Sequence, residues 1–494
     1  MKRACLLFAS LIPLAAGCVT PSKVRAPVAT PPQAYESPRP EPDSLSPASL
    51  DRWWTLYGDT QLDALVDRAL ANSPDARDAL AKLQQAAAIR TETIDQAYLP
   101  TTSLTASESR SDTKVLSGAV TSVPGVPGGF TEAGASNTLS AGFDVSWELD
   151  LFGRRAVTRR TANADFYTAA FTYEATRTAL IGNVALSLFQ ARGLALQLQD
   201  AREIARIDRD LLRLTSVKFD HGLSPRSDLD QATATAEAAD AQAESLRAQL
   251  ETSRRTLLVL IGSGFDPLAS LPAGPDVGTP PAVPATLPGD LLRRRPDIRS
   301  AEWRITSAKG TLRTDELAVL PTIKLSPGVT LADASGPFGG TTAVWSLGAN
   351  LTAPILDRPR LLAQIRAQRA VAEQDVIAYE KAVQTAYGDV ENAFTNLDSD
   401  RRRLAMLQSA ETRAQAAYTA ARTGYGRGYS DLTAALQAET TWRNIRSQRS
   451  SAQSTVMQRS VQVFEALGGG WTPDAPAAST PLATAAARAV APGG

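Results

Sequence analysis

The sequence predicts a membrane protein of mixed α+β class, in which strands of an outer-membrane-type β-barrel alternate with very long helices. Residues 139–149 and 343–353 alternate apolar with polar or small side chains. Such two-faced strands cross a bilayer in a barrel. Proline is absent from residues 128–224 and 360–472, so helices far longer than those of globular domains can form.

The N-terminus predicts export. Lys2 and Arg3 precede an apolar stretch, which predicts a signal peptide over residues 1–17. The residues before Cys18 resemble a bacterial lipobox, although Ala15 stands where Leu is usual. We therefore predict a lipid such as palmitate on Cys18, with residues 18–50 as a lipidated tether rich in Pro, Ser and Ala. The alternative is ordinary signal cleavage beside an incidental cysteine.

Residues 51–265 are predicted to form a first structural unit. An amphipathic helix over 62–97, broken near Pro74, leads to a weakly patterned strand over 101–109 and the clear strand over 139–149. A helix over 154–218 then reaches a turn near Gly222. The return helix has apolar residues in alternating steps of three and four, the spacing of a coiled-coil seam.

Residues 289–470 repeat this order after a linker over 266–288. A helix to about residue 319 leads to strands over 322–332 and 342–353, then to a helical hairpin turning at residues 423–428. Pro327 inside the third strand predicts a bulge or an unpaired side. The ordered matches predict two internal repeats, followed by a disordered tail over 471–494.

Composition excludes several classes of function. Lys plus Arg and Asp plus Glu both number 51, so no net charge favours nucleic acid as a partner. One His and two Cys leave little for a metal site, a catalytic triad or a disulfide framework. A hydrolase with an Asp/Glu pair has no support beyond abundant carboxylates. We expect no enzyme activity, no metal and no cofactor besides the lipid.

Barrel closure requires an oligomer. Within hydrocarbon every backbone N–H and C=O needs a partner, and single-chain outer-membrane barrels have at least about eight strands. Four strands per chain must therefore be completed by other copies. Two, three or four copies all satisfy closure.

The chain resembles the outer-membrane efflux channels of TolC type, in their lipoprotein branch of NodT or OprM kind. The residues that carry the resemblance are Trp53-Trp54 with Gly58-Asp59, Trp147 to Arg154, Leu291 to Ile298, Ala353-Pro354-Ile355 and Ala466 to Trp471.

The resemblance implies a homotrimer whose four strands per chain form a shared 12-stranded transmembrane barrel, continued by a periplasmic α-helical barrel. It implies a passive duct that exports small molecules, including drugs, as the outer-membrane part of a tripartite system. The implied partners are a periplasmic adaptor and an inner-membrane pump, usually proton-driven, of resistance-nodulation-division type. The protein would be lipid-anchored in the outer membrane and span it, with most of its mass in the periplasm.

The resemblance also implies a periplasmic gate at the hairpin tips. Ring-forming carboxylates would attract cations there. The candidates are Asp228, Asp230 and Asp431, although N-terminal charge on a helix explains the same residues. Tyr425 and Arg427 could tie neighbouring hairpins or simply be solvated. The family often has Asp where this chain has Gln437.

Aromatic residues on the strands are predicted to face lipid: Phe143, Trp147 and Trp345. An internal sheet packed on a core would need a covering segment, and none is left over. Arg293, Arg294 and Arg295 are predicted to form structural salt bridges. The rival to the duct is a lipid-anchored periplasmic coiled-coil scaffold without a pore.

Overall fold

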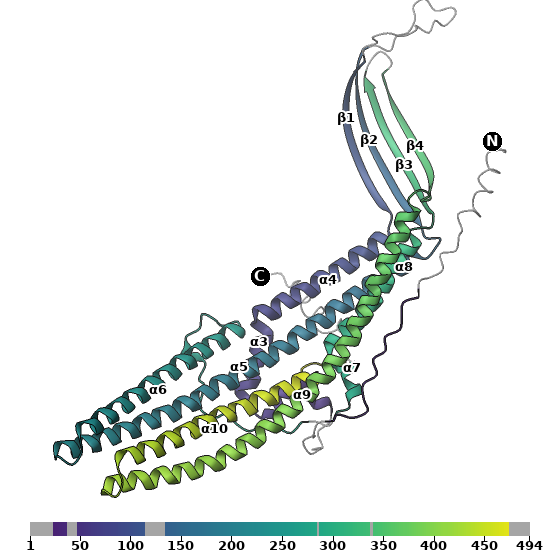
Figure 1. Cartoon of the computed structure of the whole chain (residues 1–494). Coiled ribbons are helices and arrows are strands. Elements are labelled where there is room, and N and C mark those ends of the chain that lie inside the picture. The colour runs from purple at the N-terminus through teal and green to yellow at the C-terminus, as the bar shows by residue number, and fades with distance from the viewer. Residues whose placement is uncertain (1–22, 37–46, 114–133, 284–285, 336–338, 474–494) are drawn as a thin grey trace, which may run out of the picture. The chain divides into compact units, whose positions relative to one another are not determined.

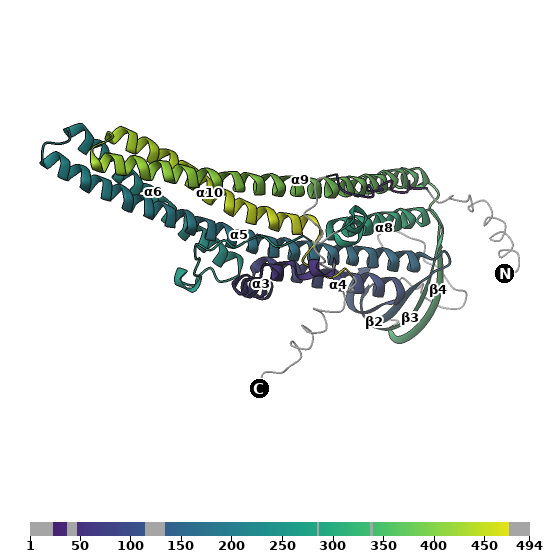
Figure 2. The same ribbon diagram turned by 90° about the horizontal axis from the view of Figure 1, so that it is seen from below.

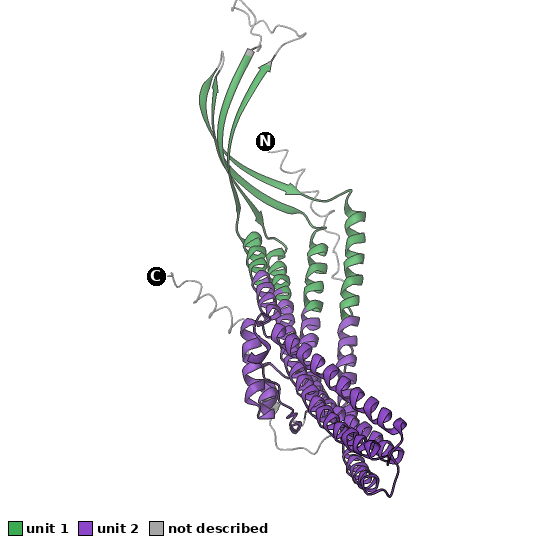
Figure 3. Cartoon of the chain, turned by 90° about the vertical axis from the view of Figure 1, so that its left-hand side faces the viewer, with its two compact units in different colours: residues 1–26, 87–165, 304–376 green, residues 27–86, 166–303, 377–494 purple. Residues whose placement is uncertain are grey.

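The computed structural model describes residues 23–36, 47–113, 134–283, 286–335 and 339–473. The chain divides into two compact units (Figure 3), unit 1 from residues 1–26, 87–165 and 304–376, and unit 2 from residues 27–86, 166–303 and 377–494. The predicted signal peptide and nearly all of the predicted tail lie outside the described residues.

The elements follow the predicted order (Figure 1). In chain order they are η1 (Pro47–Tyr57), α3 (Thr60–Asn72), α4 (Pro74–Tyr98), β1 (Thr101–Thr113), β2 (Gly134–Leu149), α5 (Arg154–Asp220), α6 (Arg226–Leu260), η2 (Leu268–Ser270), η3 (Pro288–Asp290), α7 (Leu291–Arg294), α8 (Pro296–Leu317), β3 (Thr322–Ser335), β4 (Gly340–Thr352), α9 (Arg358–Arg427) and α10 (Leu432–Ala466).

Unit 1 contains one antiparallel sheet in the order β1-β2-β3-β4. Phe143 lies opposite Leu104 of β1 and Val329 of β3, and Val329 lies opposite Trp345 of β4. Because side chains alternate along each strand, this register places apolar residues of all four strands on one face. The exposed large apolar side chains on it are Leu104, Leu139, Phe143, Trp147, Val329, Leu331, Trp345, Leu347 and Leu351. The predicted alternation is confirmed.

Pro327 leaves one side of its strand unpaired, as predicted. It lies opposite Leu347 of β4, but the pairing of β3 with β2 lapses between Asp144–Gly328 and Trp147–Leu325. The register is the same before and after this gap, so the strand has no bulge. Proline lacks the N–H that the ladder needs on that side.

The passage from β2 to α5 occupies four residues and is tightly held. Gly153 has a φ of +77°, a conformation that favours glycine. The Asp150 carboxylate accepts hydrogen bonds from the N–H groups of Arg154, at 2.7 Å, and Arg155, at 3.1 Å. The Arg154 guanidinium donates to the Leu317 carbonyl at the end of α8, at 2.6 Å. The passage from β2 to α5 is thereby joined to the passage from α8 to β3.

Unit 2 contains the main apolar core. Trp53 stacks on Phe464, with ring centroids 5.4 Å apart and planes within 5°. Gly469 lies against this pair, and a Cβ added to it would be 2.8 Å from Trp53 Cδ1. The Trp471 indole donates to the Arg294 carbonyl at 2.7 Å. Residues of both predicted repeats therefore close one core.

Two of the three consecutive arginines have the structural role that the sequence predicts. Arg294 pairs with Asp51 at 3.0 Å, and Arg295 pairs with Asp297 at 2.7 Å and with Asp389 at 3.1 Å. These side chains of arginine are largely buried, so the pairs fix the packing of α7 and α8 in unit 2.

Two helical hairpins, α5 with α6 and α9 with α10, lie side by side in unit 2 (Figures 1 and 2). Six of the ten predicted seam residues of α6 are buried: Ala232, Ala236, Ala239, Leu246, Leu250 and Leu257. The other four are half-buried: Leu229, Ala243, Ser253 and Leu260. One stretch of α5 is long and apolar enough to cross a membrane, but 56% of it is buried in the chain. A buried core helix passes the same test.

The second hairpin turns later than predicted. The sequence places its turn at residues 423–428, whereas α9 continues to Arg427 and the chain turns at residues 428–431. Gly424 and Gly426 each cost the helix about 1 kcal/mol. Burial of Tyr425 between them, at 4% exposure, offsets that cost.

The predicted tether is partly bound to the fold. In unit 2, the N–H of Val28 donates to Glu380 at 2.8 Å and the N–H of Glu36 donates to Glu391 at 2.7 Å. The Tyr35 ring stacks on Tyr387, with centroids 5.9 Å apart. This extended segment therefore lies along α9.

Candidate functional site

The first hairpin tip carries two of the three candidate gate carboxylates. Gly222, with a φ of +70°, makes the turn between α5 and α6. Ser224 donates a hydrogen bond to Asp228 at 2.8 Å, and the Arg226 guanidinium lies 3.1 Å from Asp230. Asp228 lies in the first turn of α6, where negative charge is favourable, and Asp230 follows in the second turn. Asp228 is half-buried and Asp230 is exposed.

The third candidate carboxylate caps the return helix of the second hairpin. Gly428 has a φ of +79° and starts the turn. Asp431 accepts a hydrogen bond from the N–H of Ala434 at 2.8 Å, which is the geometry of an N-cap. The side chains of Asp431 and of Gln437, six residues later on α10, are both exposed. A capping role does not occupy the outward lone pairs of the carboxylate.

Tyr425 joins the two hairpins of one chain. Its hydroxyl lies 3.3 Å from the Thr215 hydroxyl of α5. The Lys218 ammonium donates to the Tyr425 carbonyl at 2.6 Å and lies 3.6 Å from the centre of its ring. A buried cluster surrounds this contact, made of Leu211, Tyr425, Leu432, Ala435 and Leu436.

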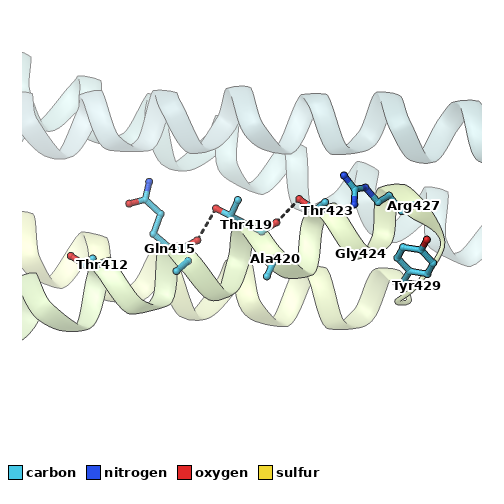
Figure 4. A pocket seen from close by; sticks show the side chains of 9 residues that line it. Thr412, Gln415, Thr419, Ala420, Thr423, Gly424, Arg427 and Tyr429 are labelled. Carbon is cyan, nitrogen blue, oxygen red and sulfur yellow. Dashed lines mark hydrogen bonds between the residues drawn. The ribbon is translucent and has the colours of Figure 1, made fainter.

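Arg427 is exposed, and no bridge from it to the other hairpin is present among the residues that the structure describes. It lies with Tyr429 at the end of a shallow groove along α9 (Figure 4). The groove is lined by small and polar side chains, two of which, Thr419 and Thr423, hydrogen-bond back to their own helix. This surface is polar and open rather than shaped around a small ligand.

The structure therefore brings some of the predicted tip residues together and leaves others apart. Tyr425 reaches the other hairpin. In the described part of the chain, the hydrogen bonds and ion pairs given above for Asp228, Asp230 and Asp431 lie within their own hairpins, and Arg427 lines a groove of its own hairpin. Lys218 was not predicted, because a lysine in the last turn of a helix is usually solvated. Its only sequence signal is its position seven residues before Pro225.

The three aromatic candidates for lipid contact lie on the apolar face of the sheet in unit 1. Trp345 is 79% exposed in the single chain, Phe143 48% and Trp147 39%. The Arg155 guanidinium lies 5.4 Å from the centre of the Trp147 ring. A cation beside an aromatic ring at a strand end suits the boundary between lipid and water.

Cys18 lies outside the described residues. Among the residues that the structure does describe, no group of three or more His, Cys, Asp or Glu side chains is arranged to hold a metal ion.

Comparison with known proteins gives consistent matches. The model of the family described as "Outer membrane efflux protein" matches residues 65–263 and 287–469. The chain is 29% identical over 482 residues to the pyoverdine export outer membrane protein OpmQ of Pseudomonas aeruginosa, covering 96% of this chain and 98% of that protein. It is 26% identical over 425 residues to the cation efflux system protein CusC of Escherichia coli, covering 85% and 88%. The solved outer-membrane channel OprN superimposes with a TM-score of 0.77 at 26% identity, over 92% of this chain and 100% of OprN.

Proposed function

Because the chain belongs to the outer membrane efflux protein family and is an outer-membrane efflux channel component, we propose that three copies build one duct with a shared 12-stranded barrel. The observation that carries this proposal is the open sheet. β1 and β4 are its edges, and its apolar face is exposed in the single chain. Edge strands in lipid must be paired, so β4 of one copy would pair with β1 of the next.

The two halves of the chain are proposed to be repeats of one unit. Support comes from the element order: two strands and a long helical hairpin follow a shorter helix in each half. Three copies would then place six similar hairpins around the bore. Near-equal hairpins can pack side by side as a helical barrel in the periplasm.

The duct is proposed to work with an adaptor in the periplasm and a pump in the inner membrane, of resistance-nodulation-division type. A channel with no energy source moves solute only down its gradient, so the pump must supply the work. OpmQ is named for pyoverdine export and CusC for cation efflux. Relatives with such different cargoes support a duct whose cargo is chosen mainly by its pump.

The hairpin tips are proposed to close the duct at its periplasmic end. Threefold symmetry would turn Asp228, Asp230 and Asp431 into rings of carboxylates that attract cations. Tyr425 would hold each pair of hairpins together, and Arg427, exposed beside it, could reach the next copy.

Reconstitution tests the duct. The purified, detergent-extracted protein should have a native mass three times that of one subunit and should give stepwise, cation-selective conductance in planar lipid bilayers. The scaffold alternative predicts a species that leaves lipid once its acyl chains are removed and never conducts. A non-conducting, water-soluble monomer would therefore exclude the duct.

Lipid attachment at Cys18 is a separate proposal with its own test. Cys18→Ala should abolish incorporation of radioactive palmitate, because the modified thiol is gone. Cys5→Ala, which lies inside the predicted signal peptide, is the matched control and should label normally. Equal labelling of the two variants would refute acylation at Cys18.

A further inference from the structure

A pair of buried carboxylates connects the two hairpins of unit 2. Asp208 of α5 and Glu439 of α10 are each 1% exposed. One guanidinium serves both of them: Arg443 Nη1 lies 3.2 Å from Asp208 Oδ2 and 3.7 Å from Glu439 Oε1. Among the ion pairs of the described residues, these two buried carboxyl groups therefore share one guanidinium.

A neighbouring pair of carboxylates has more guanidinium partners. Asp200 of α5 and Glu411 of α9 are both served by two guanidinium groups, those of Arg446 and Arg449. Ser450 also donates a hydrogen bond to Asp200. By the ion pairs of the described residues, the Asp208–Glu439 pair thus has one guanidinium partner fewer than the Asp200–Glu411 pair.

The oxygens of the pair also lack donors. Asp208 Oδ1 and both carboxylate oxygens of Glu439 have no hydrogen-bond donor in the described part of the chain. An ionised carboxylate only accepts hydrogen bonds, so two that meet can bond only if one carries a proton. Burial first, and then the adjacent Asp208, raises the pKa of Glu439 to about 9.

Among the described residues, the other groups around Glu439 donate no hydrogen bond to its carboxyl oxygens. From α9, Arg422 contributes a favourable charge, and Tyr418 stacks on Trp442 with its hydroxyl unpaired among the described residues. From α6, Ala239 packs against the same rings. Because Arg443 already occupies the space between the carboxylates, a metal cation would be repelled there.

A cavity lies beside the pair, with Arg443 in its lining. It has a volume of about 370 Å³ and is lined by residues of α5, α6 and α10, among them Asp200, Gln242, Arg443 and Asn444. Arg443 lies both in this lining and against the carboxylates. A proton can therefore exchange with solvent when the packing fluctuates.

We propose that Asp208 and Glu439 share one proton, and that this proton is a pH-sensitive latch between the two hairpins of each chain. The proton stabilises the contact between the two hairpins, because its loss leaves two buried anions beside one guanidinium. The latch holds at neutral and acidic pH and weakens as pH rises. The expectation that its release loosens the periplasmic end of the duct rests on the proposed function.

The sign follows from proton linkage. An exposed glutamate loses its proton near pH 4.5, whereas buried Glu439 keeps it up to about pH 9. Between these limits the latched state holds one proton more than the opened state. The equilibrium constant for local opening should then rise about tenfold for each unit of pH.

Hydrogen exchange on the full-length oligomer in detergent tests the latch. At pH 6, 7 and 8, after correction for intrinsic exchange rates, peptides covering residues 432–446 should open about tenfold more per pH unit in the wild type. Glu439→Gln should lose this dependence, because its amide can donate to Asp208 without a proton. Glu237→Gln, an exposed change on α6, should keep the wild-type dependence.

Equal pH dependence in the wild type and Glu439→Gln would overturn the proposal. If Glu439→Gln does not fold, Asp208→Asn is tested in its place. Its amide can also donate to the other carboxyl group, so local opening in Asp208→Asn should not change with pH. A pH dependence equal to that of the wild type would overturn the proposal. Conductance from pH 6 to 8 tests the functional consequence, and should rise with pH only where Glu439 is present. Absence of conductance in every variant would count against the duct, while the exchange slopes would still judge the latch.

Discussion

At the residue scale, the contact between Lys218 and Tyr425 is the clearest connection at the hairpin tips. The sequence suggested Tyr425 as a tie between hairpins but gave no reason to choose Lys218. A lysine near a helix end is usually solvated, and only packing reveals that this ammonium lies over a ring. A contact between residues of two helices far apart in the sequence cannot be predicted from the local sequence pattern of either helix.

Lys218→Met should loosen the tip. It removes a charge-assisted hydrogen bond to the Tyr425 carbonyl and a cation–π contact, together worth about 1–3 kcal/mol. Hydrogen exchange of residues 423–431 should quicken, and single-channel conductance should increase. Lys82→Met on α4 removes an exposed ion pair instead and should change neither. Identical tip exchange in both variants would contradict this account.

At the element scale, periodicity predicted the strands and helices well where apolar residues repeat. The strand over 139–149, the helix from Arg154 and the break at Pro74 all follow from local pattern, and the structure confirms them. β1 continues to Thr113 instead of ending near Ser109, because its last residues are all polar and only pairing with β2 identifies them as strand. The late turn at Gly428 was missed for a similar reason: burial of Tyr425 overrides the helix-breaking tendency of two glycines.

Leu347→Arg should impair insertion of the protein into the outer membrane. The residue lies on the apolar face of β4, where an arginine in lipid costs about 2–4 kcal/mol. Ser346→Arg places the same charge on the opposite face and should insert normally. Membrane fractionation and heat-modifiable gel mobility of the two variants measure this. Equal insertion would argue against a lipid-facing apolar surface.

At the scale of the whole molecule, the core of unit 2 is assembled from segments far apart in the sequence. Trp53, Arg294 and Phe464 meet around the glycines after α10. The motifs that carried the family resemblance are thus mostly packing motifs, which is why the sequence predicted the family and the fold more readily than the tip contacts. Residues at a gate act between copies, and no single-chain pattern specifies such contacts.

Gly469→Ala should destabilise the assembled protein by about 1–3 kcal/mol. Its added Cβ would lie 2.8 Å from Trp53 Cδ1 and 3.0 Å from two backbone carbonyl oxygens, so the core must shift. Gly388→Ala, in α9 with open space around its Cβ, should be neutral or stabilising. Thermal unfolding of the detergent-solubilised oligomer compares them. A midpoint for Gly469→Ala at or above that of Gly388→Ala would contradict the packing argument.

The joint at Gly153 has a mechanical consequence. The Asp150 carboxylate binds the first N–H groups of α5, and the Arg154 side chain binds the end of α8. The connection between β2 and α5 is therefore short and held by hydrogen bonds. If the proposed duct twists, we expect the change to be taken up along α5 itself and not at its joint with β2, because these hydrogen bonds fix the first residues of the helix.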